Sequence, residues 1–239
     1  MLSNKIKSKI LPSNIWSDLS ILPLDTHGWN GKCKVFEDLI CQHKPNLILE
    51  LGTWKGQSCF SMLEAASKIN LDTQIICVDT WLGSLEMLTL EPPSNTKSDT
   101  IFVEEFIKQR DTLRKNGYPG VYFQFLSNCV HLGYSNRVFP IPNTTSVGIK
   151  FLKSLDIHPD MIYVDASHDY EDSTRDIRDS WDLLSPGGVM FGDDYNSWWG
   201  VEKSVDEFAE NNNVKIEFFS LLKGWNIRFE QTYWIIRKK

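Results

Sequence analysis

The chain of 239 residues lacks the features that would tie it to a membrane or to nucleic acid. No apolar run approaches the length of a membrane-spanning helix, and residues 1–16 carry positive charge without the apolar core of a signal peptide. Lys and Arg total 25 against 31 Asp and Glu, so the net charge of -6 argues against an anionic partner. We therefore expect a cytoplasmic protein that binds neither nucleic acid nor a membrane.

Cysteine is also sparse, and its arrangement excludes the common metal frameworks. The five cysteines include no C-x-x-C pair, and their number is odd. Without paired ligands we expect no structural zinc site. Cys59 and Cys77 lie in apolar runs, where a free thiol acts as a small hydrophobic side chain. Free thiols indicate a reducing compartment.

Apolar runs that alternate with helical patterns fill most of the chain, and there is no internal repeat. This alternation predicts an α/β fold with a mostly parallel sheet and crossover helices on both faces. The expected strands are 47–51, 74–78, 137–141, 161–164, 189–192, 215–221 and 233–237. The expected helices are 58–66, 100–115, 121–132, 145–155, 171–184 and 201–211.

Two segments lie outside this pattern. Residues 1–40 are expected to form an N-terminal cover, helical or irregular, in front of a single domain at 41–239. Residues 82–99 are rich in polar side chains and contain Pro92-Pro93, so we expect an insertion over one face of the sheet. Neither segment carries a motif that identifies a substrate.

The helix expected at 171–184 is amphipathic. Its apolar stripe is Ile177, Trp181 and Leu184, opposite Asp172, Asp176 and Asp179. We expect Trp181, in this stripe, to be part of the core.

Acidic residues end four of the expected strands. Glu50 is the last residue but one of its expected strand, and Asp79, Asp165 and Asp193 each come just after the last residue of theirs. Ligands of open α/β sheets bind beyond the carboxyl ends of the strands. Four acids at one edge of the sheet therefore indicate a binding site.

A glycine-containing turn follows the first expected strand. Gly52 lets the backbone turn without a Cβ, and Gly56 lets the next helix approach a ligand closely. The start of that helix offers free N–H groups to a carboxylate, although a simple tight turn is the alternative. The spacing is not G-x-G-x-x-G, which weakens the case for NAD. Asp79 could accept hydrogen bonds from ribose hydroxyls, or could cap a helix.

These residues resemble the first two motifs of class I S-adenosylmethionine-dependent methyltransferases. The similarity is closest to small-molecule O-methyltransferases of the catechol and macrocin types, and it covers residues 45–195. The resemblance implies a Rossmann-like, mostly parallel seven-stranded sheet with an antiparallel last strand. It also implies a small-molecule substrate, and a homodimer would be consistent with it. The motifs are Glu50-x-Gly52-x-x-x-Gly56-x-Ser58 and Cys77-Val78-Asp79-Thr80-Trp81.

The resemblance implies a role in cofactor binding for each of these positions. Gly52 and Gly56 would line the methionine portion of S-adenosylmethionine, Ser58 would hold its carboxylate and Glu50 its amino group. Asp79 would bind the ribose. Thr144 and Ser146, after the third strand, would contact the adenine. The remaining expected cofactor contacts are Thr53, Thr80, Trp81 and Asp165.

Three carboxylates suggest a metal site. Asp165, Asp193 and Asp194 follow adjacent expected strands, and their mutual repulsion would require a cation if they shared a small space. Oxygen ligands suit Mg²⁺ or another hard divalent ion, and acids at matching positions bind the metal in the family. In the alternative, Asp194 caps a turn and Asp193 faces water.

His168 lies in the same acidic region and is a candidate general base, with Asp165 as the second expected catalytic residue. Histidine has an ordinary pKa close to neutral pH, so His168 could take a proton from a substrate hydroxyl, or it could only orient a neighbouring carboxylate. The chain departs from the family here. The catechol type has an amide where Asp194 stands and a lysine where His168 stands, and the macrocin type has an acid where Ser167 stands.

Three functions therefore remain open from the sequence. The first is a metal-dependent O-methyltransferase acting on a small hydroxylated molecule. The second is a metal-independent methyltransferase in which the acids only shape the pocket. The third is a non-catalytic domain that binds S-adenosylmethionine as a sensor. A hydroxylase-like relative is a further outlier.

Overall fold

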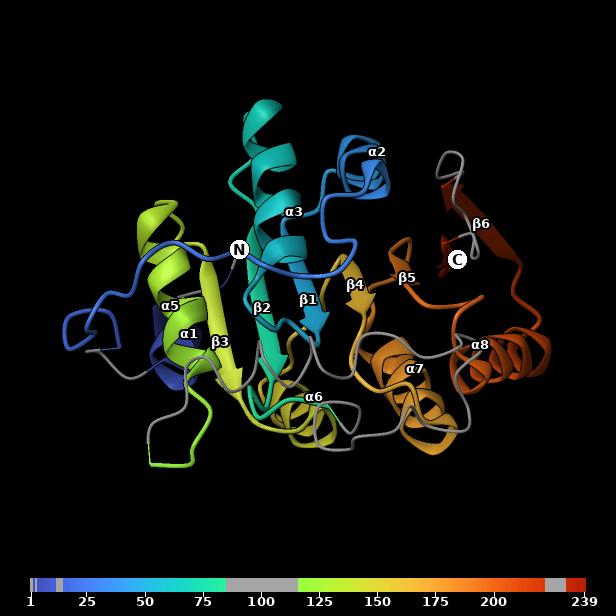
Figure 1. Cartoon of the computed structure of the whole chain (residues 1–239). Helices are drawn as coiled ribbons and strands as arrows, with labels where there is room; N and C mark the ends of the chain where they lie inside the picture. Colours follow the sequence, from blue (N-terminus) through green and yellow to red (C-terminus); the bar gives the residue numbers. More distant parts are fainter. Residues whose placement is uncertain (1, 3, 12–14, 85–115, 222–230) are drawn as a thin grey trace.

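One mixed sheet forms the centre of the molecule (Figure 1). The computed structural model describes residues 2, 4–11, 15–84, 116–221 and 231–239. Within them, the seven strands follow the order β3-β2-β1-β4-β5-β7-β6. They are β1 (Leu47–Leu51), β2 (Gln74–Asp79), β3 (Val138–Pro142), β4 (Met161–Val164), β5 (Val189–Gly192), β6 (Ile216–Leu221) and β7 (Gln231–Arg237).

The direction of the strands matches the expectation from the sequence. β1 to β5 pair in parallel, whereas β7 runs antiparallel to both of its neighbours. The predicted mostly parallel, seven-stranded sheet with an antiparallel last strand is therefore confirmed. All five residues of β1 are buried, as expected for a strand that is apolar except at Glu50 and is covered on both faces.

The strand order reverses beside β1. The chain proceeds from β1 outward through β2 to β3, and then returns to β4 on the other side of β1. In doubly wound sheets such a switch point leaves a crevice at the carboxyl ends of the strands, where ligands bind. The residues that follow β1 and β4 are therefore the first place to search for a site.

Helices cover both faces of the sheet. They are α1 (Asn4–Ile10), α2 (Lys34–His43), α3 (Gln57–Lys68), α5 (Val121–His131), α6 (Thr145–Ser154), α7 (Tyr170–Leu183) and α8 (Trp199–Asn212). Side chains of α2, α3 and α5 share one hydrophobic cluster with the sheet. Side chains of α1, α6, α7 and α8 share a second cluster on the opposite face. None of the helices described here has the length and apolar character needed to cross a membrane.

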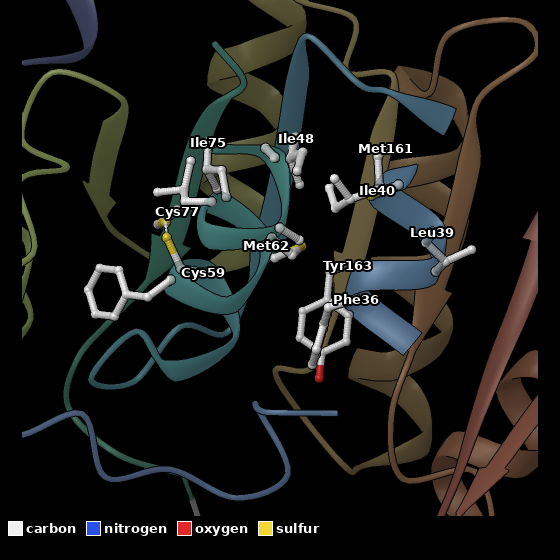
Figure 2. Packing of buried hydrophobic residues seen from close by; sticks show 14 of the residues in the cluster. Phe36, Leu39, Ile40, Ile48, Cys59, Met62, Ile75, Cys77, Met161 and Tyr163 are labelled. Atoms are coloured by element: carbon white, nitrogen blue, oxygen red, sulfur yellow. Dashed lines mark hydrogen bonds between the residues drawn. The ribbon is translucent and has the colours of Figure 1, made fainter. Parts of the chain in front are cut away.

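α2 packs directly on the sheet. Figure 2 shows Phe36 of α2 against Tyr163 of β4, with Leu39 and Ile40 on the following turn. The rings of Phe36 and Tyr163 meet edge to face with centroids 5.2 Å apart. The expected domain boundary at residue 40 falls inside this helix, because α2 spans Lys34–His43. The apolar spacing of Val35, Phe36, Leu39 and Ile40 is the sequence signal that would have located it.

The other expected strands and helices that lie in the described residues are all present, and their observed ends differ from the expected ends by no more than two residues. The helix expected at 100–115 lies outside the described residues, as does the expected insertion from residue 85 onward. One acid of α7 is buried, although it lies opposite the apolar stripe. Asp176 is only 1 % exposed and accepts a hydrogen bond from the Thr145 hydroxyl at 2.7 Å. The sequence could not show that α6 covers this side of α7.

Candidate active site

The turn after β1 requires glycine at two positions. Gly52 has φ +80°, and a Cβ there would lie 1.9 Å from the carbonyl oxygen of Asp165. Gly56 has φ +92° at the start of α3, and a Cβ there would lie 2.7 Å from the Phe60 ring. Both residues combine the left-handed conformation with close packing, which only glycine tolerates. The turn is therefore pressed against the end of β4.

Glu50 lies beneath this turn with no exposed surface. Its carboxylate accepts a hydrogen bond from the Ser58 hydroxyl at 2.5 Å and one from the Thr53 hydroxyl at 3.0 Å. Burial raises the pKa of Glu50 to about 7, although these hydrogen bonds act in the opposite direction. A cation beside the carboxylate would favour its ionised form. The structure thus brings together Glu50, Thr53 and Ser58, three of the expected cofactor residues.

Asp79 holds the same turn from the end of β2. One carboxylate oxygen accepts the backbone N–H groups of Thr53 and Trp54, both at 2.8 Å, and the other accepts that of Trp81 at 2.7 Å. These three bonds stabilise the turn whether or not a ribose binds. Thr80 stabilises the backbone that follows β2, because its hydroxyl accepts a hydrogen bond from the N–H of Leu82 at 3.2 Å.

The side chain of Trp81 does not lie at the ligand edge, where its role as a cofactor contact would place it. The residue is 1 % exposed, and its indole packs against Tyr122 and Phe125 in the core. Its indole N–H donates to the carbonyl of Trp54 at 2.7 Å. Any contact between Trp81 and a ligand would therefore come from its backbone.

Thr144 and Ser146 lie beside Asp79 at the same edge of the sheet. The N–H of Asn143, just before them, donates to the carbonyl of Asp79 at 3.0 Å. Thr144 is exposed and caps α6, because its hydroxyl accepts the N–H of Val147 at 3.3 Å. The capping role accounts for a threonine here without a ligand, so the expected adenine contact stays a prediction.

A second group of polar side chains follows β4 and β5. Asp165, His168 and Asp194 each offer one atom that could bind a metal, a carboxylate oxygen or an imidazole nitrogen, and these atoms all lie within 4.8 Å of one another. His168 Nε2 is 3.0 Å from Asp194 Oδ2, and the imidazole stacks on Trp198 with centroids 4.1 Å apart. Asp194 has φ +64°, a strained conformation for a non-glycine residue and one that recurs at functional sites.

Of the three carboxylates expected at the metal site, Asp165 and Asp194 lie together, and His168 takes the place expected for Asp193. Asp193 is not part of this group; its Oδ1 accepts the N–H of Asp194 at 2.7 Å. The side chain of Asp193 is nevertheless buried, with the residue 4 % exposed, so the alternative in which it faces water is wrong. It lines the same small cavity as Asp165, His168 and Asp194.

Electrostatic repulsion in this group is visible at Asp165. Burial and the nearby Asp194 together raise the pKa of Asp165 to about 7, although His168 acts in the opposite direction. The hydroxyl of Tyr163 donates to Asp165 Oδ2 at 2.9 Å. Sequence reasoning missed Tyr163, although its place two residues before Asp165 on one strand puts both side chains on the same face. Two carboxylates and an imidazole could hold a divalent cation.

The N-terminal segment reaches the glycine turn. Lys55 of the turn is 1 % exposed, and its ammonium group pairs with Asp25 at 2.6 Å. The Gln57 side chain donates to the carbonyl of Thr26 at 3.0 Å. Trp29 lies beside Trp54 with centroids 5.9 Å apart. Residues 25–29 therefore cover the β1–α3 turn, as the expected N-terminal cover would.

The comparison with known proteins assigns the chain to a family. A family described as "Methyltransferase domain" matches residues 49–195, which is more than half of the chain. The chain belongs to this methyltransferase family. The match spans the glycine turn, Asp79 and the group around Asp165, and it ends just after Asp194. No curated protein matches the chain.

Solved structures of methyltransferases share the fold. An O-methyltransferase from Bacillus cereus, solved with SAH, has a TM-score of 0.56 at 14% identity, over 100% of this chain and 93% of that one. TomG from Streptomyces achromogenes, solved with SAM, has 0.54 at 15% identity over 100% and 92%. The O-methyltransferase NovP has 0.56 at 15% identity over 86% and 78%. Because the sequence identities are only 14–15%, these similarities establish that the methyltransferase shares the fold of these proteins, and no more.

Proposed function

We propose that this methyltransferase transfers the methyl group of S-adenosylmethionine to a hydroxyl group of a small molecule, with a divalent cation such as Mg²⁺ at Asp165 and Asp194. The observation that carries the cofactor part is the buried carboxylate of Glu50 under a turn that requires glycine at Gly52 and Gly56. A buried acid without a basic partner among the described ion pairs suits the ammonium group of the cofactor's methionine portion.

The N-terminus of α3 supports the same orientation. The first N–H groups of a helix are unpaired within the helix and favour an anion. Ser58 stands in this first turn, which would place a carboxylate beside it while the ammonium group meets Glu50. Asp79, at the neighbouring strand end, would then face the ribose, and Thr144 and Ser146 the adenine.

The group around Asp165 fits a hard divalent cation. It offers carboxylate oxygens of Asp165 and Asp194 within 4.8 Å of each other, and their repulsion is what a cation would relieve. Asp193, buried next to them, would hold Asp194 in place through its hydrogen bond to that residue's backbone. When bound, the cation would supply a positive charge that favours the ionised form of the substrate hydroxyl.

His168 is the proposed general base. Asp194 lies 3.0 Å from its Nε2 and would hold the tautomer in which that nitrogen carries a proton. The other ring nitrogen, Nδ1, would then accept the proton of the substrate hydroxyl, and Asp194 would stabilise the resulting imidazolium. Stacking on Trp198 fixes the plane of the ring. The alkoxide oxygen would attack the methyl carbon in line with the departing sulfur.

The His168–Asp194 contact also favours a second candidate, a metal-independent reaction. The imidazolium that forms when neutral His168 accepts the substrate proton would be stabilised by Asp194 without a cation, so the two residues could serve alone as base and orienting acid. A chelator distinguishes the two candidates, because it should stop turnover in the metal-dependent reaction and leave turnover unchanged in the metal-independent one.

The acceptor class and the cation can be tested together. The purified protein is incubated with S-adenosylmethionine and a panel of phenols, catechols and sugars, and release of S-adenosylhomocysteine is followed with added Mg²⁺ or with a chelator. Turnover that stops with the chelator and returns with Mg²⁺ supports the metal-dependent O-methyltransferase. Turnover unchanged by the chelator supports the second candidate, and binding of the cofactor without turnover on any acceptor contradicts both.

A further inference from the structure

A cluster of soft ligands lies in the core, separate from the group around Asp165. Glu50 of β1, Cys59 of α3 and Cys77 of β2 come from three elements, and all three residues are fully buried. Their ligand atoms lie within 4.8 Å of one another. Figure 2 shows the sulfur atoms of Cys59 and Cys77 facing each other between α3 and β2.

The distances in this cluster are those of a tetrahedral metal site. Zinc bonds of about 2.3 Å to sulfur and about 2.0 Å to oxygen imply tetrahedral edges of about 3.8 Å between two sulfurs and about 3.5 Å between sulfur and oxygen. The two Sγ atoms are 3.7 Å apart, and Cys77 Sγ is 3.5 Å from Glu50 Oε2. A cation could therefore enter the triangle of ligands with little movement of the side chains.

The charge balance favours a cation as well. Glu50 is a carboxylate without exposed surface, and no ion pair in the described part of the chain includes it. The Thr53 hydroxyl, which donates a hydrogen bond to Glu50 Oε2 at 3.0 Å, is a further oxygen atom next to the cluster. Hydrogen bonds from Ser58, Thr53 and Cys77 stabilise this buried carboxylate in part, and a cation would add the opposite charge that they do not supply.

The chemistry of the thiols selects the kind of cation. Cys59 and Cys77 each offer a sulfur ligand, and each thiol must lose its proton before its sulfur binds a cation as thiolate. A hard ion such as Mg²⁺ gains too little from sulfur to displace these protons. Zn²⁺ and Cd²⁺ form strong bonds to thiolates and can do so.

We propose that Glu50, Cys59 and Cys77 form a binding site for a thiophilic divalent cation of the zinc class, and that this cation competes with the cofactor for Glu50. On binding, the cation forms bonds to two thiolates and one carboxylate oxygen, and the two thiol protons pass to the buffer. The competition rests on the proposed function, in which Glu50 meets the ammonium group of S-adenosylmethionine. The cation site itself does not.

The site is tested by titrating Cd²⁺ into the purified protein and following the ultraviolet charge-transfer band between thiolate and cadmium. We expect a band that saturates at one equivalent. Cys59→Ala and Cys77→Ala should each weaken Cd²⁺ binding by at least about a hundredfold, since even outer-shell partners account for ten- to a hundredfold. The matched controls are Cys129→Ala, a buried thiol outside the cluster, and Cys41→Ser, an exposed one; both should keep the band.

A measurement on the unaltered protein guards against variants that fail to fold. X-ray absorption at the zinc edge of the protein with one equivalent of Zn²⁺ should show two sulfur neighbours, with oxygen completing the shell. A shell of oxygen and nitrogen alone would overturn the site, as would a charge-transfer band that survives in both Cys59→Ala and Cys77→Ala.

The competition is tested separately with S-adenosylhomocysteine. Saturating Cd²⁺ should weaken its binding at least tenfold in the unaltered protein and leave it unchanged in Cys59→Ala. A cadmium band together with unchanged S-adenosylhomocysteine affinity would overturn the competition and keep the site. Absence of S-adenosylhomocysteine binding without any cation would contradict the proposed function instead, and the cadmium titration would still decide the site.

Discussion

Gly52 lies so close to Asp165 that a Cβ at position 52 would stand 1.9 Å from the carbonyl oxygen of Asp165. The contact joins the turn proposed to bind the cofactor to the residue proposed to bind the cation. The two halves of the site are therefore fixed relative to each other by backbone packing at the switch point between β1 and β4.

The first prediction concerns this contact. Gly52→Ala should lower the free energy of unfolding by more than about 3 kcal/mol and abolish cofactor binding, because both the positive φ and the collision with Asp165 oppose a methyl group. Gly133→Ala is the matched control: Gly133 has φ +75° but nothing within 4 Å, so only about 1 kcal/mol is lost. Urea unfolding measures both, and equal losses would show that crowding at Gly52 is unimportant.

The second prediction concerns Asp79. Asp79→Ala removes an acceptor for three backbone N–H groups and should cost about 2–4 kcal/mol of stability, together with most of the S-adenosylhomocysteine affinity. Asp79→Asn should lose less stability, because one carbonyl oxygen remains to accept. Asp72→Ala, at an acid whose side chain is 69% exposed, should change neither quantity. An Asp79→Ala protein with the unfolding midpoint of the parent chain would contradict the structural role.

The third prediction concerns the pH dependence of stability. Burial raises the pKa of Asp176 from 3.8 to about 6, so the folded state favours the protonated acid. The unfolded chain gives up this proton first as the pH rises, and stability therefore falls between about pH 4 and pH 6 and stays lower above it. Asp176→Asn keeps an acceptor for the Thr145 hydroxyl and cannot ionise.

Asp176→Asn should thus be more stable than the parent chain at pH 7.5, by up to about 3 kcal/mol, with the difference vanishing near pH 4. Thermal unfolding at several pH values measures this difference. Asp182→Asn on the same helix serves as control, because the Asp182 side chain is 63% exposed and should show no such trend. A difference that is constant across the pH range would show that Asp176 is not the titrating group.

The fourth prediction concerns the proposed base. His168→Ala should lower turnover by about 10²- to 10⁴-fold while S-adenosylhomocysteine affinity changes less than about twofold, because the imidazole acts on the acceptor hydroxyl. Asp194→Asn should also lower turnover, since the orienting carboxylate is lost. His158→Ala, whose side chain bonds to Asp156 and to the carbonyl of Leu183, should leave turnover intact. Equal turnover in His168→Ala and the parent chain would remove the base assignment.

Much of the fold follows from local patterns in the sequence. Continuous apolar runs such as Met161–Val164 predict buried parallel strands, and each acid that follows a strand is brought to one edge by the parallel arrangement alone. The approach of Asp79 to the turn at Gly52 and that of Asp165 to Asp194 are consequences of this arrangement. They could be expected before any coordinates existed.

Other contacts depend on packing between elements distant in sequence. Trp81 follows a strand end like the acids do, yet its side chain turns into the core beside Phe125. His168, rather than Asp193, joins Asp165 and Asp194 in the ligand group, and Asp194 itself has a positive φ that its residue type does not predict. Cys59 and Cys77 have no motif in common, and only the packing of α3 on β2 brings their sulfurs to 3.7 Å.

The central claim is that the turn between Glu50 and Ser58 binds S-adenosylmethionine next to a cation site. Calorimetric titration of S-adenosylmethionine into the purified protein, with and without Mg²⁺, tests it most directly. We predict one binding site in both conditions, with an affinity or enthalpy that changes when Mg²⁺ is present and does so no longer in Asp165→Ala. Absence of binding heat under either condition, in a protein whose folding is confirmed by its unfolding transition, would contradict the account.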